Sequence, residues 1–240
     1  MSRTLFVSDL HLAEDRPATT ERFERFLDEC VPGADALYIL GDLFEYWVGD
    51  DGLDLELPSR VAAALRDAAR AAPAYFMHGN RDFMIATRFS ADTGIRLLAD
   101  PTVVDLYGER ALLMHGDTLC TGDAAYQAFR ARVRDPRWQA AALARPLPER
   151  IAMATNMRLQ SEGAKGGKSV DIMDVAPRSV EAAFANAGCL LMIHGHTHRP
   201  ARHEHAVGGR TCVRWVLADW YEGGGYLEAT PAGIRAVTLP

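Results

Sequence analysis

Five short apolar segments of this chain each run directly into a polar turn, and this repetition constrains the fold more than any other feature. The segments are residues 4–7, 36–40, 74–77, 111–114 and 190–193, and the turns are Ser8-Asp9-Leu10-His11, Gly41-Asp42, His78-Gly79-Asn80-Arg81-Asp82, His115-Gly116-Asp117 and His194-Gly195-His196-Thr197-His198. In an open α/β sheet, ligands bind where strands end and the backbone turns. The pattern therefore predicts buried strands whose ends share one polar site.

Helices are expected between the first strands. Apolar spacing predicts a helix over residues 19–29, capped by Thr19 or Thr20, which would complete a β-α-β unit. Further helices are predicted over residues 58–72 and around residues 83–93. The loop at residues 45–51 combines aromatic and acidic side chains, and its carboxylates are most simply interpreted as a solvated turn.

The C-terminal part of the chain predicts more strands. Residues 103–106 and 111–114 should form a hairpin. After His198, four runs are separated by turn residues, which is typical of antiparallel hairpins. We expect these runs to form a second sheet; they are residues 204–207, 213–217, 226–229 and 234–239.

One long stretch has a different texture. From residue 124 to residue 186 the sequence has no strand signal, only helical segments broken by proline and glycine. We interpret residues 121–177 as a mostly helical insertion between two strands of a single domain that spans residues 1–240. At this length one large domain, with or without an insertion, is the expected organisation.

Composition excludes several classes of protein. A formal net charge of −6 argues against a general nucleic-acid binder. The four cysteines form no C-x-x-C pair and are expected to be reduced, mostly buried thiols. No N-terminal signal segment and no apolar run of about 18–20 residues is present. We therefore expect a protein that is kept in the cytoplasm or rests on a membrane from that side.

Seven side chains at the strand ends could bind metal ions. They are two carboxylates, one amide and four imidazoles: Asp9, His11, Asp42, Asn80, His115, His196 and His198. One ion with four to six ligands cannot use them all, whereas two ions that share a bridging carboxylate can. Mixed oxygen and imidazole ligands suit Mn²⁺, Fe²⁺ or Zn²⁺. Two such ions about 3.5–4 Å apart can clamp a phosphoryl group and hold a hydroxide between them.

Each of these residues also has a simpler explanation. A single histidine at a strand end is more often a packed core residue, and Asn80 could be only a turn residue. His196 and His198 are harder to explain in this way, because alternation places both on one side of an extended segment.

The five motifs, in this order, resemble those of the calcineurin-like metallophosphoesterases. The resemblance implies an α/β fold, an αββα sandwich of two mixed sheets, here with a helical lid insertion. It also implies that Asp42 bridges two ions. Asp9, His11, Asp42 and His198 would hold one ion, and Asp42, Asn80, His115 and His196 would hold the other.

Arg81 departs from a common pattern of that family, in which a histidine after the asparagine protonates the leaving alkoxide. Arginine stays protonated, but its planar fork can clamp phosphate. A phosphate monoester needs no proton to leave, because its second pKa is about 6. We therefore expect a pyrophosphate bond to be cut, with Arg81 as the phosphate clamp. The alternative is that Arg81 only pairs with Asp82 on the surface.

Longer segments are similar to the family of bacterial UDP-2,3-diacylglucosamine pyrophosphatases, and they extend into the insertion. They are residues 39–45, 78–83, 115–121, 126–130, 172–175 and 193–200. The resemblance implies UDP-2,3-diacylglucosamine as substrate, two Mn²⁺ per chain, a role in lipid A biosynthesis, and peripheral contact with the cytoplasmic face of the inner membrane. Product contacts would fall on Asn80, Arg81, Asp123, Ser161, Lys165, Lys168 and His196. Lys165 departs from the uncharged residue that is common there.

Other interpretations remain open. Residues 162–169 resemble a P-loop, but Glu162 stands where the first glycine should be, and a helix rather than a strand precedes it. A hydrolase of a soluble nucleotide or a phosphoprotein could carry the same motifs, and so could a non-catalytic scaffold. Apolar side chains of the insertion would suit a chamber for acyl chains, or they could pack the insertion on itself; they are Tyr126, Phe129, Ile151, Met153, Ala154 and Met157.

Overall fold

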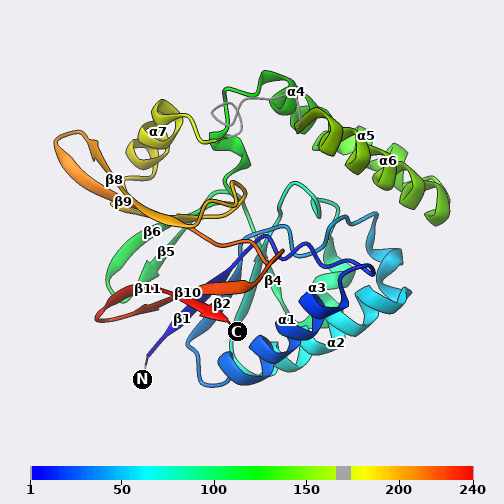
Figure 1. The fold of residues 1–240 in the computed structure, drawn as a ribbon, viewed down its shortest axis with the longest axis horizontal. Helices are drawn as coiled ribbons and strands as arrows, with labels where there is room; N and C mark the ends of the chain where they lie inside the picture. The colour runs from blue at the N-terminus through cyan, green and yellow to red at the C-terminus, as the bar shows by residue number, and fades with distance from the viewer. Residues whose placement is uncertain (1, 166–173, 240) are drawn as a thin grey trace.

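Two mixed sheets stacked face to face form the centre of the protein (Figure 1). The computed structural model describes residues 2–165 and 174–239, and for residues 160–165 it describes the backbone alone. The first sheet has the order β11 (Gly233–Leu239), β10 (Gly224–Thr230), β1 (Thr4–Val7), β2 (Ala36–Ile39), β3 (Ala74–Met77), β4 (Arg96–Leu98). The second has the order β5 (Thr102–Leu106), β6 (Glu109–Leu113), β7 (Leu191–His194), β9 (Arg210–Val216), β8 (Ala201–Val207).

The helices lie outside the two sheets, and only some of them cover a sheet face (Figure 1). In chain order they are α1 (Pro17–Cys30), α2 (Glu56–Ala71), α3 (Thr87–Thr93), α4 (Ala124–Val133), α5 (Pro136–Leu143), α6 (Leu147–Lys165) and α7 (Pro177–Ala187), with short 3₁₀ turns at Asp50–Asp54 and Asp117–Leu119. In Figure 1, α1, α2 and α3 lie against the first sheet and α7 lies against the second. None of the helices in the described part of the chain has both the length and the apolar content needed to cross a membrane.

Alternation along the strands creates three apolar layers. On β1, Leu5 and Val7 pack with α1 and α2, whereas Phe6 faces the second sheet. On β6, Leu113 belongs to this layer between the sheets, whereas Leu112 packs with α7. Successive side chains of a strand point to opposite faces, so each strand contributes to two layers. The predicted αββα sandwich is confirmed.

The sequence pattern suggested that the last two strands join the second sheet, but they join the first. β8 and β9 form a hairpin there, but β10 pairs antiparallel with β1, and β11 with β10, in the first sheet. β9 also runs parallel to β7. Leu227 and Ala229 of β10 lie in the layer between the sheets, which either sheet could have supplied. Apolar alternation predicts a strand but does not choose its neighbour.

The start of α1 also differs from the prediction. Thr19 and Thr20 are buried inside the helix, which begins at Pro17. Proline suits the first helical position because its φ is already helical and it has no N–H to leave unpaired. Arg16, the residue before it, makes no side-chain cap hydrogen bond.

Parallel pairing brings the polar turns together. β1, β2 and β3 run parallel in the first sheet, and β6, β7 and β9 in the second. The turns beyond the strands are joined as well. Asp9 N donates to Gly41 O at 3.0 Å, His11 N donates to Asp42 O at 2.9 Å, and Gly195 N donates to His115 O at 2.9 Å. Between the sheets, His196 N donates to Asp9 Oδ2 at 2.8 Å, and His115 Nδ1 lies 2.9 Å from Leu40 O. The carboxyl ends of the parallel strands of both sheets therefore meet at one edge of the sandwich.

Helices α4, α5 and α6 stand apart from this scaffold (Figure 1). They follow β6 and precede α7 and β7, and β6 and β7 are neighbouring parallel strands. No described residue of these three helices belongs to the three apolar layers. They fall within residues 121–177, which we call the helical insertion.

Candidate metal centre

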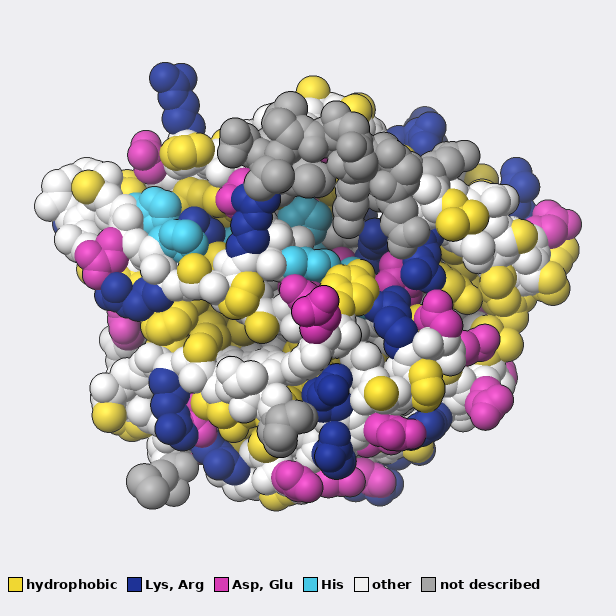
Figure 2. Space-filling model, in the orientation of Figure 1, with side chains coloured by type: hydrophobic (Ala, Val, Ile, Leu, Met, Phe, Trp, Pro, Cys, Tyr) yellow, Lys and Arg dark blue, Asp and Glu magenta, His cyan; other side chains and the backbone are white. Residues whose placement is uncertain are grey.

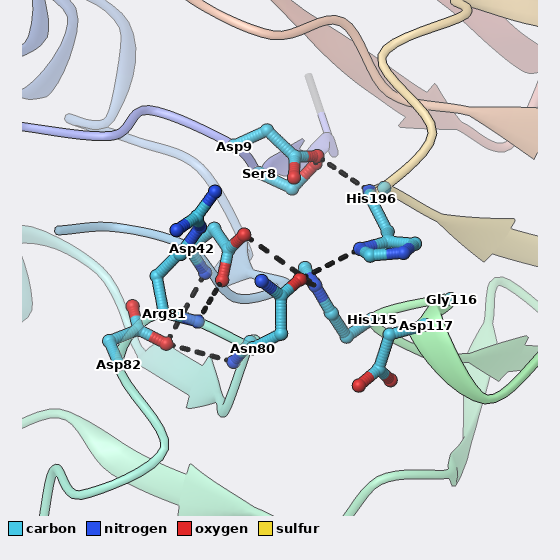
Figure 3. A network of polar contacts seen from close by, with 12 residues as sticks. Ser8, Asp9, Asp42, Asn80, Arg81, Asp82, His115, Gly116, Asp117 and His196 are labelled. Atoms are coloured by element: carbon cyan, nitrogen blue, oxygen red, sulfur yellow. Dashed lines mark hydrogen bonds and ion pairs between the residues drawn. The ribbon is translucent and has the colours of Figure 1, made fainter. Parts of the chain in front are cut away.

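The side chains that the sequence analysis selected lie together at the shared carboxyl edge, and Figure 3 shows five of them around a common space. Their ligand atoms form two groups, and within each group all atoms lie within 4.8 Å of one another. The first group is Asp9, His11 and His198, and the second is Asp42, His115 and His196. The ligand assignment itself remains a prediction, but the structure places the residues in two sets.

One carboxylate oxygen lies between the two groups. Asp42 Oδ2 is 3.7 Å from His11 Nε2 and 3.8 Å from His115 Nε2. Asn80 Oδ1 lies 2.8 Å from His196 Nδ1 and 3.1 Å from His115 Nε2. Two atoms that are each about 2.1 Å from one ion lie about 3.0–3.4 Å apart at octahedral or tetrahedral angles. These separations are near those of ligands that share an ion.

The surroundings of Asp9 indicate whether the first group of residues could bind a cation. Its Oδ1 is buried and has no hydrogen bond within the described part of the chain, although His198 Nε2 lies 3.4 Å away. Burial raises the pKa of Asp9, but the imidazoles of His198, His115 and His11 outweigh it and hold that pKa well below its usual range. An ionised, buried carboxylate oxygen without a donor costs free energy unless a cation compensates it. The group therefore fits a divalent ion.

The backbone at these residues is in a rarely occupied conformation. Five of the seven selected residues have positive φ: Asp9 (54°), His11 (50°), Asp42 (54°), His196 (69°) and His198 (54°). Among the other non-glycine residues described, only Tyr107 shares this feature. Such angles are uncommon for these residue types and tend to cluster at functional sites. The turns aim their side chains into the shared space at the expense of local backbone preference.

Asp82 supports the turns without facing the metal groups. Its carboxylate accepts from the backbone N–H of Leu43 at 2.7 Å, of Gly79 at 2.9 Å and of Asp42 at 3.3 Å. Complete burial, together with the charge of Asp42, raises its pKa to about 7. Asp82 is therefore no surface partner for Arg81. Arg81 instead lines the site, and its Nε is buried without a hydrogen bond inside the described region.

Glu45 was missed by the sequence analysis, which placed it in a solvated turn. It is 2% exposed. Arg16 donates to its carboxylate, and Arg158 Nε and His11 Nδ1 each lie 3.4 Å from it. Burial raises the pKa of Glu45, but the opposing effect of His11, Arg81 and Arg16 is larger and lowers that pKa to about 2. The available signal was a carboxylate placed between Phe44 and Tyr46, three residues after Asp42.

A pocket of about 530 Å³ joins the metal groups to the helical insertion. At one end it is lined by His11, Asp42, Asn80, Arg81, His196 and His198. At the other end it is lined by Tyr126, Phe129, Met153, Ala154 and Met157, but not by Ile151. In Figure 2, histidine side chains reach the surface near the centre of the face, with basic side chains beside them. The pocket therefore combines a polar end, lined by the candidate metal ligands, with an apolar end.

The remaining predicted contacts are only partly described. Asp123 lines the pocket and is the N-cap of α4, where its side chain accepts from Tyr126 N. The side chains of Ser161 and Lys165 lie outside the described residues, and so does the whole of Lys168.

Polar contacts attach α4 to the turns that carry the metal groups. Asp117, two residues after His115, accepts from Tyr126 Oη and from Arg130 Nε, both at 2.7 Å. Burial raises the pKa of Asp117, but His115, His196 and Arg130 outweigh it and hold it low. Arg134 Nη2 donates to Gly79 O at 2.8 Å. The first helix of the insertion is therefore fixed to both sheets.

Gly195→Ala should disrupt the site. A Cβ at Gly195 would lie 2.2 Å from both Asp9 Oδ2 and Ser8 Oγ. Because neither atom can retreat without moving a turn, we expect a loss of about 1–3 kcal/mol in unfolding free energy and weaker retention of divalent metal. Gly223→Ala is the matched control, because nothing lies within 4 Å of its Cβ position. Denaturant unfolding and metal analysis after gel filtration would measure both effects; equal behaviour of the two variants would contradict the crowding argument.

Comparison with known proteins agrees with this geometry. Residues 2–200 match the model of the calcineurin-like phosphoesterase family. Proteins named UDP-2,3-diacylglucosamine hydrolase from Xanthomonas campestris and Stenotrophomonas maltophilia are 51% and 50% identical to this chain, each over 98% of both sequences. A solved archaeal phosphodiesterase has the same fold, with a TM-score of 0.50 at 12% identity over 99% of each chain. The protein therefore belongs to the calcineurin-like phosphoesterase family of metal-binding hydrolases.

Proposed function

We propose that this protein hydrolyses the pyrophosphate bond of UDP-2,3-diacylglucosamine, giving UMP and 2,3-diacylglucosamine 1-phosphate in lipid A biosynthesis. The observation that carries the proposal is one pocket that is lined by the candidate metal ligands at one end and by apolar side chains at the other. An amphiphilic diphosphate has a charged diphosphate for the polar end and acyl chains for the apolar end. The names of the relatives that are about half identical over nearly the whole chain support the same substrate. A soluble nucleotide would leave the apolar end without a ligand.

We propose two Mn²⁺ ions per chain. Asp9, His11, Asp42 and His198 would hold one, and Asp42, Asn80, His115 and His196 the other. When bound, the ions would activate water and polarise the phosphoryl oxygens. Arg81 lines the pocket beside Asn80, so its guanidinium would face a bound diphosphate. Arg81 would bind the diphosphate but not protonate the leaving group, which suits the departure of a sugar phosphate.

The helical insertion would hold the acyl chains. Met153 and Met157 suit such a chamber, because an unbranched, polarizable side chain adapts to chain shape. Leu143 and Leu159, on α5 and α6, are 46% and 59% exposed. They would support peripheral contact with the cytoplasmic face of the inner membrane, where the lipid substrate resides. Product contacts at Asn80, Arg81, Asp123, Ser161, Lys165, Lys168 and His196 belong to the same proposal.

Asp42→Ala should release both ions together. It removes the anionic oxygen that lies between the two groups, so the two cations would lose their shared ligand. We expect well under two ions per chain by metal analysis of the purified variant. Asp28→Ala, on the exposed face of α1, should keep the wild-type content. Two retained ions with normal turnover in Asp42→Ala would exclude Asp42 as the bridge.

The products and the attacked phosphorus test the reaction directly. Purified protein should convert UDP-2,3-diacylglucosamine to UMP and the sugar phosphate, and a chelator should abolish turnover. In ¹⁸O-labelled water the label should appear in UMP, because water attacks the α-phosphorus opposite the departing sugar phosphate. Label in the sugar phosphate would mean attack on the other phosphorus.

Removing the acyl chains tests the chamber. Each buried CH₂ contributes roughly 0.8 kcal/mol. If the apolar end buries about five CH₂ groups of the acyl chains, removing the chains would cost about 4 kcal/mol. That corresponds to a fall of about 10³-fold in kcat/KM for UDP-glucosamine relative to the diacylated substrate. If both substrates were hydrolysed with equal efficiency, the chamber would be excluded and a soluble nucleotide would become the better candidate.

A further inference from the structure

Glu45 occupies an unusual place, because a buried carboxylate outside the two metal groups contacts four positively charged or N–H-bearing side chains. Its two oxygens have separate tasks. Oε2 lies 3.4 Å from His11 Nδ1 and accepts from Arg16 Nη2. Oε1 lies 3.4 Å from Arg158 Nε and 3.9 Å from Arg81 Nη1. One oxygen therefore faces a predicted metal ligand, and the other faces the predicted phosphate clamp and the helical insertion.

The backbone holds Glu45 firmly in this position. The segments that follow β1 and β2 stay paired beyond the strands, through a parallel bridge between Leu12 and Phe44. Glu45 N donates to Leu12 O at 3.0 Å, and Leu12 N donates to Leu43 O at 2.9 Å. The register of this pairing places Glu45 beside His11. Its carboxylate can then orient groups that arrive from other segments.

The approach of Glu45 to His11 favours one ring tautomer. His11 Nδ1 is buried without a hydrogen bond in the described region, and Glu45 Oε2 lies 3.4 Å from it. His11 Nε2 points to the first metal group, 3.3 Å from His198 Nε2 and 3.7 Å from Asp42 Oδ2. Its Nδ1 points away, towards Glu45. A carboxylate beside Nδ1 favours the tautomer with the proton on that nitrogen and leaves the lone pair on Nε2. Histidines that ligate metal commonly depend on such a partner for orientation and basicity.

The contacts of Oε1 connect the site to the helical insertion. Arg158 lies on α6, whereas Arg81 follows Asn80 at the end of β3. Both side chains line the pocket between the metal groups and the insertion. The buried Nε of Arg81 has no hydrogen bond within the described region, so this atom does not fix the orientation of the guanidinium. Glu45 lines the same pocket and provides an opposite charge there, with its Oε1 3.9 Å from Arg81 Nη1.

We infer that Glu45 is a positioning residue that sets the His11 imidazole for metal binding and the Arg81 guanidinium for phosphate binding, and joins both to Arg158 of the helical insertion. The inference deepens the proposed function and rests on its assignment of His11 and Arg81. The alternative is that Glu45 only stabilises the fold as a buried ion pair.

Glu45→Gln tests this role, because the amide keeps the shape but offers only one acceptor. Whichever way the amide is turned, its NH₂ faces either the Arg81 and Arg158 guanidinium groups or the His11 and Arg16 donors. We expect calorimetric Mn²⁺ titration of the metal-free protein to show affinity weakened by about 10–100-fold, and kcat to fall by a similar factor. Glu45→Asp, which keeps the charge but is one CH₂ shorter, should shift both quantities in the same direction by a smaller factor and guards against misfolding of the amide variant.

Asp51→Asn is the matched control. Asp51 also pairs with an arginine of α6, Arg150, which additionally donates to Val48 O. Its loss should lower the melting temperature but leave Mn²⁺ affinity unchanged. If Glu45→Gln and Glu45→Asp lower only the melting temperature, as Asp51→Asn does, the positioning role is wrong.

A double-mutant cycle separates the two tasks of Glu45. If Glu45 acts through Arg81, Glu45→Gln should lower kcat less in an Arg81→Ala background than in the wild type. Additive effects would exclude that link. The cycle is interpretable only if wild-type protein hydrolyses UDP-2,3-diacylglucosamine; failure of that reaction would overturn the proposed substrate, whereas the Mn²⁺ titrations would still decide the role of Glu45.

Discussion

The close approach of the polar turns at one edge of the sandwich is the constraint on which the rest of the structure depends. Gly79 and Gly195 are the points of closest approach, because a Cβ at Gly79 would lie 2.1 Å from Asp42 Oδ1 and one at Gly195 would lie 2.2 Å from Asp9 Oδ2. Because Gly195 has no side chain, a turn of the second sheet can touch Asp9 of the first, and because Gly79 has none, two turns of the first sheet can come into contact. The left-handed backbone at Asp9 and Asp42 then turns their carboxylates inwards. Strain at the turns is tolerated because the strands behind them are held in place by parallel pairing in the two sheets.

Three carboxylates that are not predicted metal ligands hold this arrangement. Asp82 binds backbone N–H groups of two turns, Asp117 binds Tyr126 and Arg130 of α4, and Glu45 faces His11 and the arginines. Each is nearly inaccessible to solvent, and a buried charge is stable only when donors or opposite charges compensate it. The contacts of Asp117 and Glu45 also tie the helical insertion to the metal groups, whereas those of Asp82 join the turns that follow β2 and β3. An amphiphilic substrate that spans the pocket would touch both parts of one connected network.

The sequence alone was sufficient for much of the site and the fold. Asp9, His11, Asp42, Asn80, His115, His196 and His198 were selected because each lies at the end of an apolar segment, and parallel strands must bring such ends to one edge. The layers follow in the same way, since Leu5, Phe6 and Val7 alternate between two faces. These features depend on local periodicity and on the chemistry of side chains, both of which are readable along the chain.

Only the tertiary structure decided the features that depend on which residues, distant in the sequence, come into contact. β10 joined β1 rather than the second sheet, although the apolar side of Leu227 would fit the same layer from either sheet. Glu45, in a segment with the composition of a solvated loop, became buried because Arg16, Arg81 and Arg158 reach it from three other parts of the chain. A local pattern determines whether a residue can form a strand or carry a charge. The neighbour that pairs with the strand or neutralises the charge is set by long-range packing, which no local pattern records.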